Sequence, residues 1–131
     1  MRSSDRVLVL SITLVVVVGV VALLPLLARS RAEAPREIVL VAREMNFFLS
    51  GRDEANPALR LRPGERVRIV VRNEEPGVIH NFEIPDWRVA TRLLNSGESD
   101  AVEFRVPEGR GTQTYVCTPH STMMRGTIVL E

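Results

Sequence analysis

The residues of this chain that could bind a transition metal lie in two short segments. The first segment carries His80, and the second carries Cys117, His120 and Met124. The two histidines are the only ones in the sequence, and Cys117 is the only cysteine. Two imidazoles, one thiolate and one thioether are the donor set of a blue-copper centre, in which Met is a weak axial ligand. The residue types therefore predict a site for a single copper ion that exchanges one electron.

The spacing of the second segment supports the same chemistry. Cys117 ends a strand-like run, TQTYVC, and His120 follows three residues later, so a tight turn can direct both side chains toward one ion. Pro119 restricts that turn because its ring fixes φ. A lone Cys is usually a small buried hydrophobe and a lone His is usually hydrogen-bonded, so the joint pattern carries the argument. His80 lies on a different expected strand, and the fold must bring it to the loop.

The numbers of histidines and cysteines, together with the net charge, exclude several classes of protein. A multicopper oxidase or nitrite reductase needs further histidines, and a binuclear oxidase centre needs a second cysteine, so we expect no enzymatic activity and no small-molecule substrate. A net charge of +1 does not fit a strongly basic nucleic-acid binder. One cysteine excludes an intramolecular disulfide, so the domain must be stabilised by burial of its core.

Short strands are the elements that must position these residues. In residues 65–73 (ERVRIVVRN), Val67, Ile69 and Val71 alternate with arginines, as in a strand with one solvated face. Pro-Gly and Asn-Ser-Gly turn signals separate similar runs. These seven runs are residues 37–42, 58–62, 78–84, 88–94, 101–106, 112–117 and 126–131. Seven to eight such strands predict an all-β, antiparallel sandwich, whose end loops cluster. The polar residues 50–57 predict a surface loop or a single helical turn.

The N-terminal residues 1–28 differ from the rest of the chain. Residues 7–28 are apolar and uncharged, and as a helix they would span roughly 33 Å, which matches the hydrocarbon core of a bilayer. We predict an uncleaved transmembrane anchor. A cleaved signal peptide is the alternative, with Ala-Glu-Ala at 32–34 as a candidate cleavage site. Residues 29–36 predict a polar linker, and residues 37–131 the β domain.

The two ligand segments resemble the cupredoxins, the small blue copper proteins that include plastocyanin, amicyanin, pseudoazurin and azurin. His80-Asn81 resembles the first-ligand pair of that family, and YVCTPH (115–120) resembles the ligand loop of amicyanin and pseudoazurin. HSTMMRG (120–126) is instead similar to azurin, in which the axial Met stands four residues after the His. That register makes Met124 the axial ligand. Met123 is the alternative, because the axial Met of amicyanin stands three residues after its His.

The resemblance also implies a Greek-key fold and contacts around the ligands. In the family, the backbone N–H of the Asn after the first His meets the thiolate, and its side chain reaches the residue after the Cys. In this sequence these residues are Asn81 and Thr118. Pro119 has no N–H, so one donor to the Cys117 sulfur is missing, which predicts a lower reduction potential than in a site with two donors.

The resemblance implies a blue copper electron-transfer protein that cycles between Cu(I) and Cu(II), with the solvent edge of His120 as the path for the electron. Its partners would be a redox donor and acceptor, such as a cytochrome or an oxidase. The domain would lie on the periplasmic or extracellular side of a single-pass anchor, or would be periplasmic or secreted if the segment is cleaved. The alternatives are a copper chaperone or storage protein, and an accessory subunit of a respiratory oxidase, since VIHNFEIP (78–85) is similar to oxidase subunit II.

Overall fold

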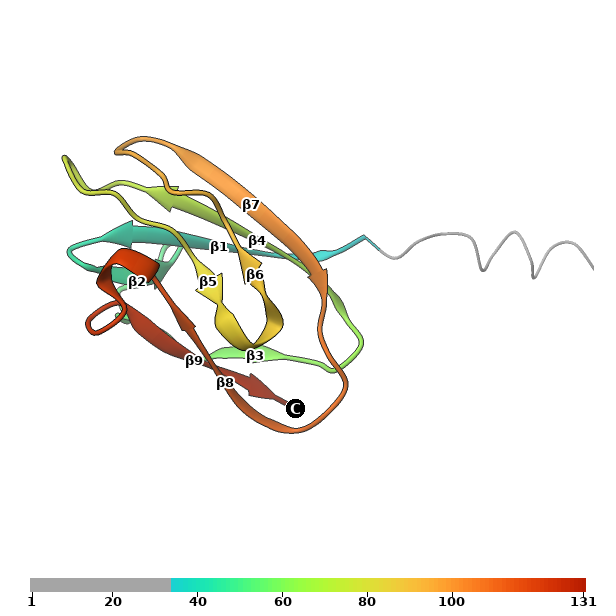
Figure 1. Cartoon of the computed structure of the whole chain (residues 1–131). Coiled ribbons are helices and arrows are strands. Elements are labelled where there is room, and N and C mark those ends of the chain that lie inside the picture. The colour runs from blue at the N-terminus through green and yellow to red at the C-terminus, as the bar shows by residue number, and fades with distance from the viewer. Residues whose placement is uncertain (1–33) are drawn as a thin grey trace, which may run out of the picture. The chain divides into compact units, whose positions relative to one another are not determined.

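The computed structural model describes residues 34–131, which fold into two facing β-sheets (Figure 1). The predicted all-β sandwich is confirmed. The predicted anchor (1–28) and the first five residues of the predicted linker (29–33) lie outside the described residues. Among residues 34–131, no helix is long and apolar enough to cross a membrane.

The described residues form nine strands, one more than the upper prediction. The four-stranded sheet has the order β2-β1-β4-β7 and the five-stranded sheet the order β3-β9-β8-β5-β6. The strands of the first sheet are β1 (Arg36–Arg43), β2 (Asn46–Leu49), β4 (Arg66–Asn73) and β7 (Ser99–Arg105). Those of the second are β3 (Leu59–Leu61), β5 (Glu83–Ile84), β6 (Val89–Ala90), β8 (Gly111–Val116) and β9 (Arg125–Leu130). Two short 3-10 helices are η1 (Pro85–Trp87) and η2 (Thr118–His120).

The expectation of purely antiparallel pairing is wrong in two places. β1 pairs with β4 in parallel, and β3 pairs with β9 in parallel, while the other strand pairs are antiparallel. The chain passes repeatedly from one sheet to the other, so strands that neighbour each other in space are often distant in sequence. Side-chain alternation reveals which face of a strand is buried, but it does not reveal the direction of the neighbouring strand.

The segments predicted as strands at 78–84 and 88–94 are mostly irregular. Their regular parts are β5 and β6, which pair with each other, and an isolated bridge joins His80 to Leu94. The side-chain amide of Asn73, at the end of β4, donates to the carbonyls of Val78 (2.7 Å) and Leu94 (2.8 Å). This buried Asn therefore joins the backbone just before His80, the first predicted ligand, to Leu94, the bridge partner of His80.

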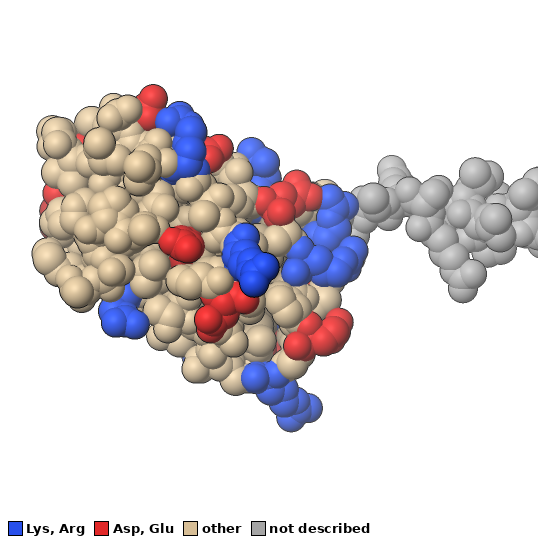
Figure 2. Space-filling view, in the orientation of Figure 1, with Lys and Arg blue, Asp and Glu red and all other residues tan. Residues whose placement is uncertain are grey.

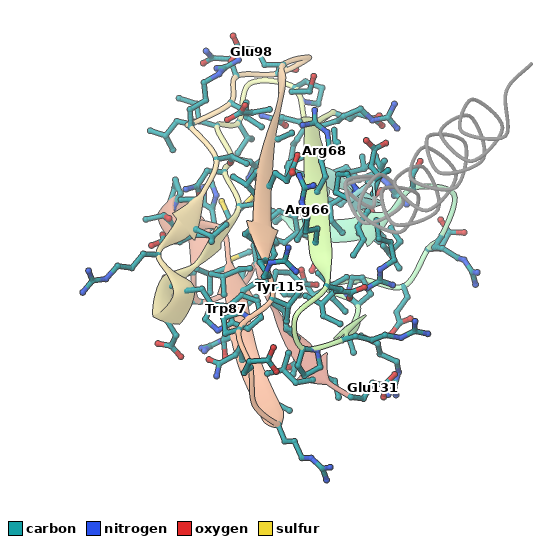
Figure 3. All side chains as sticks on the ribbon, turned by 90° about the vertical axis from the view of Figure 1, so that its right-hand side faces the viewer. Arg66, Arg68, Trp87, Glu98, Tyr115 and Glu131 are labelled. Atoms are coloured by element: carbon teal, nitrogen blue, oxygen red, sulfur yellow. The ribbon has the colours of Figure 1, made fainter. Side chains whose placement is uncertain are left out.

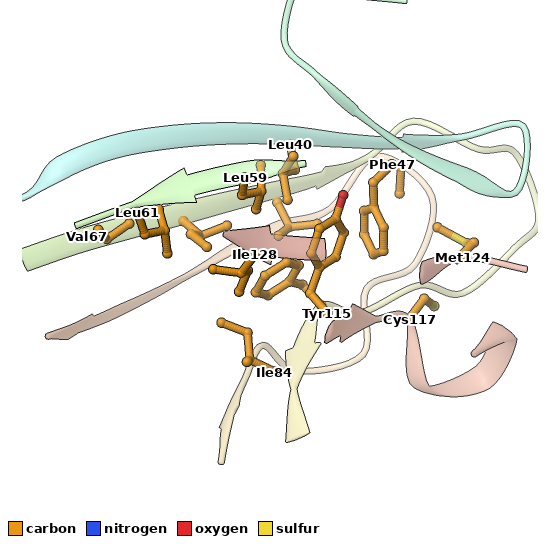
Figure 4. Close-up of a cluster of buried hydrophobic side chains, with 14 of the residues drawn as sticks. Leu40, Phe47, Leu59, Leu61, Val67, Ile84, Tyr115, Cys117, Met124 and Ile128 are labelled. Carbon is orange, nitrogen blue, oxygen red and sulfur yellow. The ribbon is translucent and has the colours of Figure 1, made fainter. Parts of the chain in front are cut away.

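The core fills the space between the sheets and continues to the predicted site. Val67, Ile69 and Val71 of β4 are fully buried, as the alternation predicted. Arg66 and Arg68 lie on the opposite face of β4 (Figure 3) and form ion pairs with Glu103 and Glu37. In the interior, Phe47, Phe82 and Tyr115 form an aromatic cluster, with ring centroids 5.4 to 5.9 Å apart. Cys117 and Met124 lie at one end of this core (Figure 4).

Candidate metal centre

The loop between β8 and β9 carries three of the four predicted ligands, and backbone hydrogen bonds close it tightly (Figure 1). The N–H of Cys117 donates to the carbonyl of Met124 (2.9 Å). The N–H groups of His120 and Met124 donate to the carbonyls of Cys117 (3.0 Å) and His120 (2.9 Å). Pro119 lies in the first turn of η2, where its fixed φ suits the helix and its missing N–H leaves no bond unmade. The two residues between Cys117 and His120 thus form one short helical turn.

Gly126 follows the ligand loop at the start of β9, and a glycine is required there because a side chain would clash with Tyr115. The sequence analysis did not identify this requirement. It pairs with Tyr115 across β8 and β9. A Cβ atom at Gly126 would lie 2.2 Å from Cζ of the Tyr115 ring, far inside van der Waals contact. The absent side chain therefore leaves room for the ring, whose hydroxyl donates to the carbonyl of Pro57 (2.7 Å). This hydrogen bond anchors β8, whose last residue directly precedes Cys117.

The structure brings His80, Cys117 and His120 together. The Cys117 Sγ atom lies 3.6 Å from Nδ1 of His80 and 3.5 Å from Nδ1 of His120. The three candidate ligand atoms all lie within 4.8 Å of one another. Bonds from a metal to His nitrogen and Cys sulfur are about 2.0 to 2.3 Å long, so one ion can reach all three atoms. Residues 37 positions apart in the chain, His80 and Cys117, therefore meet as predicted.

The two candidate axial methionines have opposite environments. Met124 is fully buried and lies close to Cys117 in the close-up of the core (Figure 4). Met123 is 57% exposed. Met124, which stands four residues after His120 as in azurin, is therefore the candidate that lies in the interior. The donor set of two imidazoles, a thiol and a neighbouring thioether fits a type 1 copper ion.

Asn81 ties the two ligand segments together. Its side-chain oxygen accepts a hydrogen bond from the backbone N–H of Thr118 (2.7 Å), and its amide group donates to the Thr118 hydroxyl (3.0 Å). The Thr118 hydroxyl in turn donates to Glu83. The contact between the Asn81 side chain and Thr118, which the resemblance implied, is therefore present.

The environment of Cys117 favours its protonated form in the absence of a metal. Burial raises the pKa of the thiol, and the backbone N–H groups of Asn81 and His120, which act in the opposite direction, do not fully offset it. Metal binding to Cys requires the thiolate, so loading of the site releases a proton.

Glu75 is a site residue that the sequence analysis missed. Its carboxylate oxygen Oε2 lies 2.8 Å from Nε2 of His80 and accepts a hydrogen bond from the backbone N–H of Met45 (3.0 Å). Burial by itself raises the pKa of Glu75, but these hydrogen bonds and the nearby histidines outweigh burial and hold the pKa below its usual value. The sequence offered no signal that distinguishes Glu75 from Glu74, which is exposed.

The surface near the site is apolar. His80, Cys117 and Met124 are fully buried, whereas His120 is partly exposed. Among the described residues, the exposed large hydrophobic side chains are Ile79, Leu93 and Met123. Ile79 directly precedes His80, Leu93 precedes the bridge partner of His80, and Met123 precedes Met124. Few charged side chains appear at the end of the molecule where η2 and β2 lie, and more gather toward the start of β1 (Figure 2).

Comparison with known proteins supports the chemistry inferred from this geometry. Residues 69–131 match the family described as "Copper binding proteins, plastocyanin/azurin family". The comparison with curated protein sequences gave no match.

Solved structures of auracyanins and of rusticyanin share the fold. Auracyanin B is 25% identical, with a TM-score of 0.60, over 76% of this chain and 91% of that chain. An auracyanin from Roseiflexus castenholzii is 17% identical, with a TM-score of 0.59, over 76% of this chain and 99% of that chain. Rusticyanin from Thiobacillus ferrooxidans is 23% identical, with a TM-score of 0.56, over 72% of this chain and 76% of that chain.

Proposed function

Because this chain is a cupredoxin in which the residues of a type 1 copper site converge, we propose that it is a membrane-anchored electron carrier. His80, Cys117 and His120 would hold the ion, with Met124 as the axial ligand. A copper ion bound there would supply a one-electron couple between Cu(II) and Cu(I). The convergence of the three ligand atoms within 4.8 Å is the observation that carries this proposal.

Hydrogen bonds within the protein hold the segments that carry the ligands. The loop that carries Cys117 and His120 is closed by its own backbone bonds, and Asn81 joins that loop to the segment of His80. A site whose shape is fixed by the protein changes little between oxidation states, which favours fast electron transfer.

The partly exposed ring of His120 supports a route for the electron between the buried ligands and a partner. The apolar side chains of Ile79, Leu93 and Met123 would surround this route with a surface for brief docking. The partners would be a redox donor and acceptor, such as a cytochrome or an oxidase. The same apolar surface would also suit assembly beside a respiratory oxidase.

The burial of the ligands argues against a copper chaperone or store. Such a protein must release its ion to a partner, and this requires ligands that the partner can reach. In this chain Cys117, His80 and Met124 have no exposed surface. An electron can leave through the edge of His120 while the ion stays in place.

The proposed location is the periplasmic or extracellular side of a membrane, with residues 1–28 as a single-pass anchor and the N-terminus inside. Arg36 begins β1 at one end of the sandwich, and the site lies near the other end of that strand (Figure 1). With a rise of about 3.3 Å per residue, β1 separates the two by roughly 20 Å. The first strand of the domain thus begins at the end of the sandwich that lies away from the proposed ligands.

A visible spectrum of the copper-loaded full chain tests the carrier. We expect one copper per chain, an intense Cu(II)–thiolate absorption and reversible reduction, and Cys117→Ser should abolish the absorption. A colourless chain that binds only Cu(I) would contradict the carrier and favour the chaperone. Protease protection of intact cells and right-side-out vesicles tests the location, since digestion of the domain only from the outer side is expected.

A further inference from the structure

Glu75 meets the ring nitrogen of His80 that faces away from Cys117. The Nδ1 atom of His80 faces the sulfur at 3.6 Å, and its Nε2 atom lies 2.8 Å from Oε2 of Glu75. The His80 side chain is fully buried, and the Glu75 side chain is only 17% exposed. A carboxylate in so sheltered a place therefore acts on one specific ring nitrogen of a predicted ligand.

The backbone around Glu75 holds the carboxylate in place. The N–H of Glu75 donates to the side-chain oxygen of Asn73 (3.0 Å), the residue that also fixes the backbone around His80. On the other side, Met45 donates its N–H to the same carboxylate oxygen that meets His80. Glu44 and Met45 have φ values of 52° and 57°, a left-handed conformation that side chains other than glycine seldom adopt. This uncommon turn directs the Met45 N–H at the carboxylate.

We propose that Glu75 is a positioning residue that sets the tautomer of His80 and lowers the reduction potential of the site. An acceptor at Nε2 keeps the ring proton there and leaves the lone pair of Nδ1 directed at the metal position. A carboxylate partner also makes the ring a stronger donor, and its negative charge stabilises Cu(II) relative to Cu(I). This inference rests on the copper site of the proposed function.

Two substitutions separate the charge of Glu75 from its hydrogen bonds. Glu75→Gln keeps an oxygen that can accept from His80 and Met45 but removes the charge, whereas Glu75→Ala removes both. The matched control is Glu74→Gln or Glu74→Ala, because Glu74 is the adjacent acidic residue, is exposed and pairs only loosely with Arg72 (3.6 Å).

The first measurement is copper affinity and reduction potential of the full chain in detergent. We expect Glu75→Ala to weaken Cu(II) binding by about 10- to 100-fold, with a smaller loss for Cu(I). Each tenfold loss of Cu(II) affinity relative to Cu(I) raises the potential by about 59 mV. Glu75→Gln should lie between the wild type and Glu75→Ala, and the Glu74 variants should match the wild type. Equal potentials for the Glu75 and Glu74 variants would overturn the proposal.

The second measurement needs no copper. Because the chain has two histidines, ¹⁵N-histidine labelling gives only two ring systems to assign by NMR. We expect the metal-free wild type to carry the His80 proton on Nε2, and a proton on Nδ1 instead would overturn the proposal. If Glu75→Ala does not fold, Glu75→Gln and the wild-type tautomer still decide the question. A wild-type chain without blue colour would refute the electron carrier, and the tautomer would then test the role of Glu75 separately.

Discussion

The two histidines of the site lie in contrasting surroundings. His80 is fully buried, its Nε2 atom meets a sheltered carboxylate, and the flanking backbone is fixed by Asn73. His120 is partly exposed and lies in a single 3-10 turn. Both nevertheless direct Nδ1 at the same sulfur, at 3.6 and 3.5 Å.

This difference indicates a division of labour between the two sides of the site. The interior side fixes the geometry of the ligands, because its hydrogen bonds reach β4 and the turn between β1 and β2. The exposed side allows exchange with a partner, because one ligand edge reaches the surface without opening the rest. An electron carrier needs both properties, a rigid site and a short path to solvent.

Removal of each ring tests the contrast most severely. His80→Gly should lose copper binding, because it leaves a closed cavity beside Glu75 that free imidazole does not readily enter. His120→Gly should also lose the normal spectrum but should regain a blue colour when imidazole is added, because its position opens to solvent. Titration of each variant with copper and imidazole, followed by visible absorption, measures the difference. Equal rescue of both variants would contradict the contrast.

The loop between β8 and β9, which carries three of the four ligands, was the more predictable part of the site from sequence. Cys117, His120 and Met124 lie within eight residues, so one loop brings them together, and their residue types already specify the chemistry. The strands could also be predicted where one face is buried, as in β4. The four-residue β2 was missed, although Phe47 and Phe48 within it are both buried.

The interior side was less predictable because long-range contacts define it. His80 was identified by its residue type and the adjacent Asn81, but Glu75 was not, since its role depends on a turn 30 residues away at Met45. The parallel pairs β1–β4 and β3–β9 were missed for the same reason. Periodicity reports the burial of a residue, whereas the choice of neighbouring strand is a property of the whole chain.

Asn81 joins the two sides, so its loss should affect both. Asn81→Ala removes two hydrogen bonds to Thr118 and leaves a backbone N–H without its partner, which should cost about 1 to 3 kcal/mol of stability. Chemical denaturation of the metal-free protein measures this cost. Asn95→Ala is a control on an exposed turn. If the metal-free Asn81→Ala variant were as stable as this control, the two segments would not be coupled through Asn81.

Substitution of the two methionines should give a smaller effect, a shift in reduction potential that depends on which methionine is replaced. Met124→Leu keeps the volume and should change stability by less than about 1.5 kcal/mol, but it removes the thioether and should raise the reduction potential. Met123→Leu is the matched control, since the side chain is 57% exposed and a surface change usually stays within about 0.5 kcal/mol. Voltammetry of both variants tests the assignment. Equal shifts would remove the basis for choosing Met124.

Tyr115 tests whether the core next to the site stays closed as the pH rises. Burial, with a smaller contribution from Glu54, raises the pKa of Tyr115 well above its usual value. In the unfolded chain the phenol ionises near pH 10, so its contribution to stability is complete below about pH 10 and is lost progressively above it. Since Tyr115 is the only tyrosine, phenolate absorbance reports this residue alone.

We expect the phenolate absorbance to appear together with unfolding, which the fluorescence of Trp87 monitors. We do not expect it near pH 10 in the folded protein. Tyr115→Phe should lose about 1 kcal/mol of stability at neutral pH and should lack this alkaline loss of stability. A phenolate in an intact sandwich would instead mean that the core around Tyr115 admits water.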